Sequence, residues 1–533
     1  MKKRYLYLAA LGLIVIPAAA QETYQSEKLI ENDLNGTARY VGMGGAMEAL
    51  GADISTISSN PAGIGLFRSS QAALSGGLVV QGSAKTSLNY DNTDISIKGH
   101  KNNASFDQIG FVWAHRTGNR SFLNFAFNYH KGQNFDQILS TAGSLIGQVN
   151  NNTIYASQNK LSALKYNNNA TDSWQTNALD AAYIGNTSNP GMLSIVNGVA
   201  DYLDGKSYLF GQYQHGYIGN YDFNISGNIN DRVYLGVTFG IQDVHYHSNS
   251  FYTENLENSQ YSNSFESLRI TGTGFDAKFG AIFRPIADSP FRIGLYVNTP
   301  IFYDLSLSAS SDVDMGFISN PDNTASRGND ADYDYKINTP WKFGVSLGHT
   351  IGNYLALGAT YEYSDYSTLD NRYNDGGYYD NWYGDYYQTS VSDDAMNDNT
   401  KFVLKGVHTL KLGAEYKPIK DMAIRLGYNY ISPKFNKNGF RDGSIASPGT
   451  AYATSTDYTN WGSTNRFTCG LGYTMDKFFF DMAYQYSSTN GDFYPFMSYT
   501  PKVATDYEGY NVANASKVSN KRNQVLLTLG YKF

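Results

Sequence analysis

The chain has 533 residues and a formal net charge of −7, and only 16% of its residues are charged, against roughly 25% in an ordinary globular chain. Aromatic residues make up 15% of the chain, glycine occurs 52 times, and Cys469 is its single cysteine. One thiol excludes a disulfide framework and a multi-cysteine metal site, and the charge pattern indicates no nucleic-acid surface. High aromatic and glycine content with little charge is instead typical of a membrane β-barrel.

Residues 1–20 have the pattern of a secretory signal peptide. Basic residues at 2–4 precede an apolar run over 5–16, and the small residues at 18–20 supply a cleavage site. We therefore expect an exported protein whose mature chain begins near Gln21. No later apolar run reaches about 18 residues, the length of a membrane-spanning helix, so we do not expect helices to hold it in a membrane.

Residues 21–68 are rich in glycine and alanine, mixed in polarity and too irregular for a strand. We predict a short helix over Met43–Leu50. A segment of this length ahead of a barrel can fold back into the lumen, and about fourteen strands enclose a space too wide for wall side chains to fill. We therefore expect residues 21–68 to form a plug, or hatch.

The tetrapeptide Asn60-Pro61-Ala62-Gly63 stands out within this segment. Pro61 fixes φ and lacks an N–H donor, Asn60 before it favours an extended or turn state, and Gly63 permits a positive φ. We predict a rigid turn followed by a hinge, with a role in gating. Taken alone, the same four residues also fit an ordinary loop turn.

The rest of the chain, residues 69–533, shows segments of about ten residues with strict two-residue alternation, as expected of an all-β transmembrane barrel. Residues 232–242 are the clearest case. The odd-numbered apolar face holds Val233, Leu235, Val237, Phe239 and Ile241. Segments at 341–348, 410–416 and 422–430 alternate in the same way.

Short and long connections alternate along the chain. The short turns fall at 116–120, 227–231, 285–290, 350–353, 417–421 and 474–477. The long polar stretches lie near 83–104, 132–211, 247–264, 307–333, 368–401, 434–464 and 489–520. This plan predicts an antiparallel barrel of about 14 strands with brief turns on one side of the membrane and extended loops on the other. Because an open edge is not viable in hydrocarbon, the first strand, near 71–82, should pair with the last, near 521–533.

The longest connection, 132–211, is unusually apolar for an exposed loop. The apolar residues that recur there at helical spacing are Met192, Ile195, Val196, Val199 and Leu203. Helices of this kind would either form a groove that captures an apolar ligand or pack on each other over the barrel mouth. Both possibilities stay open.

Two further features remain ambiguous. His245 and His247 share one face of a strand end and fit iron or metal ligands, but without a third ligand they fit solvated loop residues better. The acidic and aromatic stretch from Asp365 to Tyr387 fits a calcium or sugar contact, and fits better a solvated loop with tyrosines at the membrane interface. The sequence shows no phosphate-cradling loop, zinc motif or nucleophile elbow, so we expect no enzyme, no bound metal and no cofactor.

The motif T-A-R-Y-V-G-M-G-G-A at 37–46, followed by A-D at 52–53 and N-P-A-G at 60–63, resembles the hatch signature of the FadL/TodX family of outer-membrane hydrophobic-compound transporters. Weaker matches follow in that family's order. These are T-P-W-K-F-G-V at 339–345, L-G-A-E-Y at 412–416, R-L-G-Y at 425–428 with S-P at 432–433, and G-L-G-Y at 470–473 with D-M-A-Y at 481–484. Residues 132–334 match poorly.

The resemblance implies a fourteen-stranded barrel plugged by a hatch and passive uptake of long-chain fatty acids or aromatic hydrocarbons. It also implies capture by the outer loops, movement of the hatch and lateral exit through the wall at a kinked third strand. The third strand here, about 121–131, has no internal glycine or proline, so the sequence does not place the exit.

We therefore expect a monomer in the bacterial outer membrane that contacts lipid, hydrophobic small molecules and, during biogenesis, the barrel-assembly machinery, with no nucleic-acid partner. One alternative is a haem receptor of the same fold that uses His245 and His247. The others are an adhesin and an outer-membrane enzyme, although no serine or aspartate paired with a histidine is evident near the barrel rim.

Overall fold

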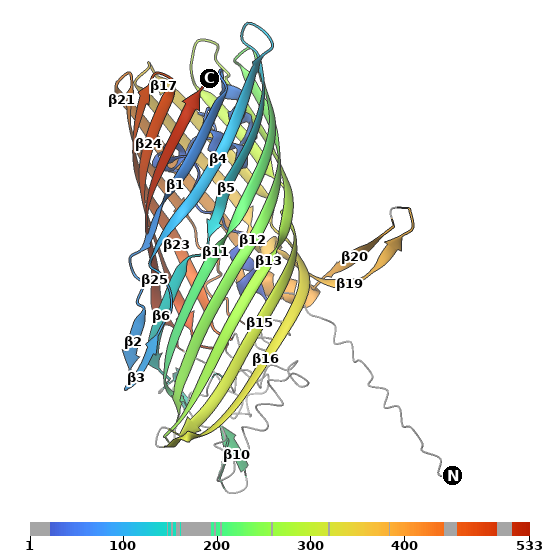
Figure 1. The fold of residues 1–533 in the computed structure, drawn as a ribbon, viewed down its shortest axis with the longest axis vertical. Helices are drawn as coiled ribbons and strands as arrows, with labels where there is room; N and C mark the ends of the chain where they lie inside the picture. The colour runs from blue at the N-terminus through green and yellow to red at the C-terminus, as the bar shows by residue number, and fades with distance from the viewer. Residues whose placement is uncertain are drawn as a thin grey trace.

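A single antiparallel sheet closes on itself as a barrel (Figure 1), which confirms the predicted fold class. The chain crosses the barrel wall fourteen times, and each crossing is called a stave below. The computed structural model describes residues 22–145, 148–150, 153–155, 160, 193–196, 199–202, 205–256, 259–317, 320–382, 384–441, 456–497 and 514–533. The expected signal peptide, 1–20, lies outside the described residues.

Three of the staves are built from two consecutive strands. In chain order the fourteen are β1 (Gln71–Gln81), β4 (Asn102–Arg116), β5 with β6 (Phe122–Asn134, Gln137–Ser144), β11 (Gly205–Ile229), β12 (Val233–Leu256), β13 (Gln260–Phe283), β14 with β15 (Arg292–Asn298, Phe302–Phe317), β16 with β17 (Asn320–Asn338, Lys342–Ile351), β18 (Leu355–Asp365), β21 (Gly406–Ile419), β22 (Met422–Ile431), β23 (Tyr458–Met475), β24 (Phe478–Tyr494) and β25 (Ser516–Lys532).

The remaining strands form hairpins attached to this wall. They are β2 (Ser87–Tyr90) with β3 (Thr93–Ser96), β7 (Gln148–Asn150) with β8 (Thr153–Tyr155), β9 (Leu193–Val196) with β10 (Val199–Tyr202), and β19 (Asp370–Asp380) with β20 (Asp385–Ser392). The predicted pairing of the first and last strands is confirmed, since β1 and β25 are in register from Gln71 opposite Lys532 to Gln81 opposite Arg522.

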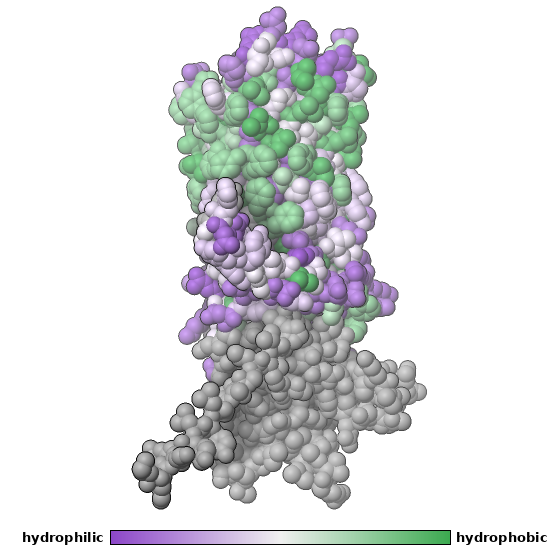
Figure 2. Space-filling model, turned by 90° about the vertical axis from the view of Figure 1, so that its right-hand side faces the viewer, coloured by the Kyte–Doolittle hydropathy of each residue, from purple (hydrophilic) through white to green (hydrophobic). Residues whose placement is uncertain are grey.

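Alternation places apolar side chains on the outside of the wall. On β12, Leu235, Phe239 and Ile241 are 48%, 49% and 45% exposed, whereas Thr238 and Gln242 on the opposite face are almost fully buried. Figure 2 shows the outward-facing apolar residues as a belt across the face in view, over the part of the barrel away from the grey region. An outward apolar belt on a barrel with a polar interior is the arrangement that faces hydrocarbon.

The six predicted short turns are confirmed as the breaks between consecutive strands. They share one end of the barrel with the C terminus (Figure 1), here called the turn end. The opposite end, called the loop end, lies beyond the apolar belt.

The loop end differs from the sequence prediction. The polar stretches 247–264 and 307–333 are mostly not loops, because β12 pairs with β13 and β15 pairs with β16 almost to their tips. The prediction used an apolar outward face to recognise strands. Beyond the belt that face meets no lipid. On β15 it carries the polar residues Ser308, Ser310 and Asp312, so this strand escapes the pattern.

The segment before β1 contains only short helices. They are α1 (Thr23–Ser26), η1 (Glu27–Leu29), α2 (Ala38–Gly42), η2 (Ile54–Ser58) and η3 (Pro61–Leu66). The helix predicted over Met43–Leu50 is wrong: α2 lies before it and is capped by the Thr37 side chain, which accepts from the backbone N of Tyr40. Positive φ angles of 64° at Gly44 and 78° at Gly45 end the helix there.

Two further helical pieces lie beside the wall, η5 (Tyr366–Thr368) and α5 (Asp394–Val403). Within the described part of the chain, every helix is too short or too polar to cross a bilayer.

Candidate functional site

The N-terminal segment, residues 22–67, runs through the inside of the barrel. Next to its turn-end limit, Arg68 forms an ion pair with Asp231 in the β11–β12 turn. Further along the lumen, the backbone N of Ala38 donates to Thr528 Oγ1 of β25 at 2.7 Å. Towards the loop end, Glu22 lies 3.7 Å from Arg441. The segment therefore touches the inner wall over most of the barrel's length.

Asn60-Pro61-Ala62-Gly63 is fully buried and packs against β11, β12 and β13. Asn60 caps η3 by accepting from the backbone N of Ala62 at 3.2 Å, and its amide donates to Glu48 O at 3.1 Å. Ser226 Oγ on β11 donates to Pro61 O at 2.8 Å. The predicted rigid turn is thus present as a capped 3-10 helix fixed to the wall, while its gating role stays a prediction.

Buried ion pairs join the middle of the segment to the wall. Lys411 lies 2.9 Å from Glu48 of the segment and 2.8 Å from Glu362 of β18. Arg39 of α2 lies 3.0 Å from Glu415, which also accepts from Arg425 at 2.7 Å. Because buried charges are tolerated only when paired, these groups depend on one another. They fix residues 37–67 in the turn-end half of the lumen.

Residues 22–31 form a hook at the loop-end side of the segment. Tyr24 stacks on Phe435 with ring centroids 5.2 Å apart, and Glu31 lies 2.8 Å from Lys434. Burial raises the pKa of Glu22 above its usual value, and the positive charge of Arg441 offsets this only in part. A buried carboxyl of this kind holds its proton to a higher pH than one in water.

An apolar inner zone surrounds the hook. Inward-facing positions of the wall are polar near the turn end, but over several strands they become apolar at the height of the hook. The wall side chains of this zone include Val244, Tyr246, Leu268, Ile270, Leu305, Leu307, Tyr335 and Ile337, and they pack with Tyr24, Leu29 and Ile30 of the hook. A membrane barrel that passes only polar solutes has no need for such a lining.

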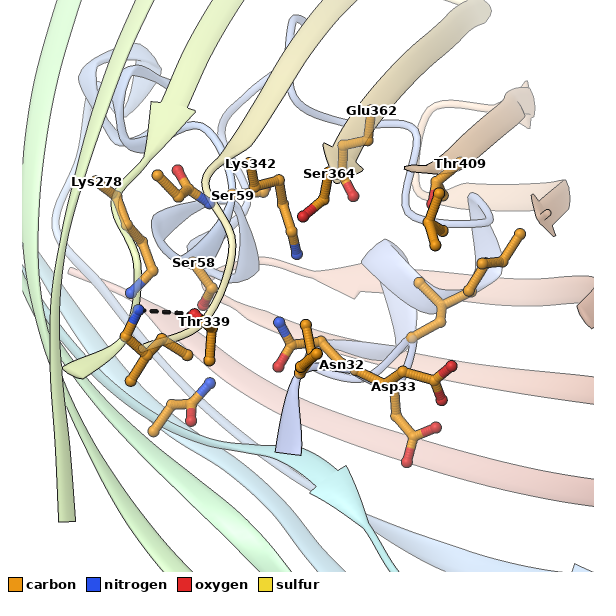
Figure 3. Close-up of a pocket in the computed structure, with 18 of the residues that line it drawn as sticks. Asn32, Asp33, Ser58, Ser59, Lys278, Thr339, Lys342, Glu362, Ser364 and Thr409 are labelled. Carbon is orange, nitrogen blue, oxygen red and sulfur yellow. Dashed lines mark hydrogen bonds between the residues drawn. The ribbon is translucent and has the colours of Figure 1, made fainter. Parts of the chain in front are cut away.

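A cavity of about 140 Å³ lies between the apolar inner zone and the turn-end half of the lumen (Figure 3). Its lining is mixed. Ile30, Ile301, Val407 and Ile431 supply apolar surface, and the rest is mostly serine, threonine, asparagine and charged side chains.

The charged lining residues are nearly all paired. The four acidic residues each have a cationic partner: Glu31 with Lys434, Asp33 with Arg466, Asp276 with Lys278, and Glu362 with Lys411. Lys342 differs, since within the described residues no hydrogen bond or ion pair engages its ammonium. Figure 3 shows this side chain extended into the cavity. The cavity therefore offers, beside apolar surface, one ammonium that makes no hydrogen bond or ion pair among the described residues.

The wall is interrupted next to this cavity. The pairing of β4 with β5 runs only from Arg116 opposite Phe122 to Gln108 opposite His130. Towards the loop end from that point, β4 pairs with β1 alone and β6 pairs with β11 alone. The outward side chain of Phe106, 50% exposed, flanks this interruption. The gap between β4 and β5 thus opens beside the apolar belt.

Two residues of the N-terminal segment close the gap from inside, and we call Asp33 and Asn35 the latch. The backbone N of Asp33 donates to Gly132 O at 2.7 Å, and its carboxylate accepts from the backbone N of Asn134 at 2.9 Å. The Asn35 amide donates to Asp107 Oδ1 on β4 at 2.9 Å. The latch therefore bonds to both sides of the gap.

The residues predicted to form a capture groove are described only in part. Ile195 and Val196 lie on β9 and Val199 lies on β10, and the two strands form an antiparallel hairpin. The helix expected from their spacing is therefore wrong. Short apolar runs fit a strand and a helix about equally well by periodicity. Met192 and Leu203 lie outside the described residues, and the role of all five in capture stays a prediction.

The histidine pair lies on the outer surface of β12. His245 Nε2 lies 2.9 Å from Asp243 Oδ2, and the His247 ring stacks on His215 of β11 with centroids 4.8 Å apart. Among the described residues, no group of three or more histidine, cysteine, aspartate or glutamate side chains is arranged to hold a metal.

Sequence reasoning missed the latch and did not single out Lys342. The alternation of 341–348 does place Lys342 on the face opposite Trp341 and Phe343, so the sequence predicts that its side chain points into the barrel. The break between β5 and β6 had a weaker signal in the sequence. Gly132 lies opposite the register shift on β11 and is one residue beyond the strand predicted over 121–131. Nothing in the polar run around Asp33 and Asn35 indicates their contacts.

No family model matches the chain, and no curated protein matches it. Among solved structures, the chain is similar to a monoaromatic hydrocarbon channel, CymD, with 11% identity, a TM-score of 0.48, and 94% of this chain and 99% of that chain covered. A Pseudomonas aeruginosa FadL homologue (13% identity, TM-score 0.47) and the Ralstonia pickettii toluene transporter TbuX (12%, 0.47) are covered to the same extents. At such identities and TM-scores these are likenesses only, and the function has to be argued from the residues described above.

Proposed function

We propose that this protein is a passive outer-membrane transporter for amphiphilic hydrophobic molecules, which leave the barrel sideways through the gap between β4 and β5. The observation that carries the proposal is the interrupted pairing beyond Gln108 and His130, closed from inside by the latch. A continuous ladder would leave an apolar solute no way from the lumen into lipid. Here side chains replace the backbone ladder. They are those of the latch and of Lys131 on β5, which donates to Ser105 Oγ on β4 at 2.7 Å. Such bonds can break without unfolding the wall.

The route follows the lumenal surfaces in order. A molecule that enters from the loop end meets the apolar inner zone around the hook and then the cavity. The cavity lining includes both latch residues, Asp33 and Asn35. A ligand that occupies it competes for space with the latch, so that binding and opening are linked. Residues 60–63 stay fixed to β11 and serve as the base on which the preceding chain moves.

The ligand class follows from the chemistry of the cavity. An apolar chain fits the inner zone, where burial contributes about 0.8 kcal/mol for each methylene group. An anionic head fits Lys342, the one lining cation without a partner within the described residues. A long-chain fatty acid combines both features, whereas an aromatic hydrocarbon leaves the lysine unused. We therefore place long-chain fatty acids ahead of monoaromatic hydrocarbons as substrates.

Tying the latch to the wall tests the proposal. In a Cys469→Ser background, Asn35→Cys and Asp107→Cys place two thiols where an amide and a carboxylate now bond at 2.9 Å. Oxidation, or a short bifunctional thiol reagent, is expected to abolish uptake of a radiolabelled long-chain fatty acid by cells, and reduction is expected to restore it. Normal uptake by the fully cross-linked protein would contradict the lateral route.

The matched control joins two wall residues away from the gap. Thr464 and Thr489 are directly opposed on β23 and β24, and their hydroxyls lie 2.7 Å apart. The pair Thr464→Cys with Thr489→Cys reports any general effect of oxidation on the barrel. It is expected to leave uptake unchanged.

A further inference from the structure

The β19–β20 hairpin leaves the barrel sideways. Its base continues the wall, since β19 pairs with β16 from Asn338 opposite Asp370 to Tyr335 opposite Tyr373. Beyond the base the hairpin projects away from the barrel, with its tip tilted towards the turn end (Figure 1). In Figure 2 it faces the viewer at the margin of the apolar belt that lies nearer the loop end. The hairpin therefore extends beside the barrel at the height where the belt ends.

Two local features set this direction. The register shifts between Asn374 and Gly377, and Gly376 at the shift has a φ of 73°. Such a bulge bends the strand that carries it. At the base, Arg372 donates to Asp370 at 2.7 Å and to Ser390 O at 2.7 Å. The outward course of the hairpin is thus built into its base and does not depend on contacts at its tip.

Aromatic side chains cover both faces of the distal hairpin. Tyr378 is opposite Tyr387 with stacked rings, and Tyr379 is opposite Tyr386. The exposed fractions of these four side chains are 57%, 42%, 58% and 63%, in that order, and Trp382 at the tip is 88% exposed. So much aromatic surface on a protruding element marks a site of contact with something other than water.

We propose that the distal β19–β20 hairpin, residues 374–389, is an interfacial anchor that lies among the lipid headgroups of the adjoining leaflet, with Trp382 as its deepest residue. Tyrosine and tryptophan are the side chains that prefer the membrane–water interface, because each combines an apolar ring with a polar group. The hairpin starts where the apolar belt ends and tilts towards it, so its contact surface continues the lipid-facing surface of the barrel. Aromatic residues on both faces fit an element surrounded by headgroups better than one that docks a partner on a single face.

The charge of the hairpin sets its depth. Asp375 and Asp380 lie in the same stretch as the aromatic rings, and the sequence from 373 to 400 contains no lysine or arginine. Carboxylates are costly in hydrocarbon, so the tip stays at headgroup level.

Spin labelling of the full chain in lipid nanodiscs tests the anchor. A Cys469→Ser background leaves one added thiol, at Trp382→Cys, for a nitroxide. The measured quantity is the ratio of collision rates with oxygen, which concentrates in lipid, and with a water-soluble nickel chelate. Matched controls are Phe239→Cys in the apolar belt and Asn119→Cys in an exposed turn. In phosphatidylcholine nanodiscs we expect a ratio at position 382 between those of the two controls.

A second label keeps all five aromatic residues in place. Gln388→Cys reports on the exposed strand beside them. Its ratio is expected to exceed that of Asn119→Cys and to fall to that value when Tyr378, Tyr379, Trp382 and Tyr386 are all replaced by serine. Ratios at 382 and 388 equal to that of Asn119→Cys in phosphatidylcholine would overturn the anchor. Protection that appears only when lipopolysaccharide is added would also overturn it, in favour of sugar recognition.

Discussion

At the residue scale, the proposed function assigns the recognition of an anionic head group to Lys342. Replacing it with methionine keeps most of the length of the side chain and removes its charge, so the loss is expected to be selective. We predict that Lys342→Met weakens binding of a long-chain fatty acid at neutral pH by about tenfold or more, equivalent to about 1.4 kcal/mol. Binding of the corresponding fatty alcohol should stay within about twofold, and Lys342→Arg should retain acid binding.

Calorimetry with the acid and the alcohol in one detergent measures both effects. Lys417→Met is the matched control, because Lys417 is 43% exposed on its side chain and does not line the cavity. Equal losses for acid and alcohol in Lys342→Met would show that the lysine supports the shape of the cavity and does not recognise the head group.

Lys411 tests how the N-terminal segment is held. It is the common partner of Glu48 on the segment and Glu362 on the wall. Removing one member of a buried ion pair typically costs about 3–5 kcal/mol, because the remaining charge is left without a partner. We predict that Lys411→Met loosens the segment and raises the sensitivity of residues 22–67 to proteolysis. Adding Glu48→Gln and Glu362→Gln, which removes the stranded charges, should restore much of the resistance.

At the element scale, the chain turns sharply after α2 at Gly44. Its φ is 64°, and a Cβ there would lie 2.8 Å from Tyr428 N and 2.9 Å from Leu412 O. Gly376 has a φ of 73°, and a Cβ there would meet nothing within 4 Å. An alanine at this position would therefore cause backbone strain but no steric contact. A left-handed non-glycine residue costs roughly 1–2 kcal/mol. We predict that Gly44→Ala lowers the thermal midpoint of the segment clearly more than Gly376→Ala changes that of the barrel. Equal effects would mean that the backbone of the wall near Tyr428 shifts to make room for the added methyl group.

The elements in contact with lipid could be predicted from the sequence because lipid imposes a simple rule on them. The alternation of residues 232–242 is legible since every second side chain must be apolar outside and small or polar inside. Beyond the lipid, an apolar outward face is no longer required, and the two-residue alternation is lost from the sequence. Residues 307–312 belong to β15, but their outward side chains, Ser308, Ser310 and Asp312, are polar, and the sequence therefore predicts a loop there.

The candidate site was predictable to a lesser degree. Pro61 fixes its own φ and restricts Asn60 before it, which predicts the rigid turn. Gly63 lies inside η3 and does not use the positive φ that glycine permits. Alternation gives the inward direction of Lys342. The latch contacts of Asp33 and Asn35 join positions about a hundred residues or more from their partners on β5, and no local rule relates them. The helix predicted over Met43–Leu50 failed because two consecutive glycines at 44 and 45 end α2 first.

At the scale of the whole molecule, the lumen is divided along its length. The turn-end half is filled by residues 37–67, which the buried ion pairs of Arg39 and Glu48 fix to the wall. The loop-end half holds the hook and the apolar inner zone. The cavity and the gap lie where the two halves meet. Under the proposed function, this division would separate a permanent seal against ions from a movable part that admits the substrate.

The division predicts different outcomes for two deletions in the exported protein. Removing residues 22–36 takes away the hook and the latch but leaves the turn-end seal, so fatty-acid uptake is expected to become faster while ion conductance in planar bilayers stays low. Removing residues 22–66 also takes away the seal, and because about fourteen strands enclose a wide lumen, large conductance steps are expected.

Removal of the external hairpin, residues 374–389, is the control for the two deletions and should leave both uptake and conductance near those of the full chain. High conductance after the shorter deletion would show that residues 37–67 do not seal the lumen by themselves. Low conductance after the longer deletion would show that the wall, or loops at the loop end, close the barrel without the N-terminal segment. In either case the division of the lumen into a fixed seal and a movable latch would have to be abandoned.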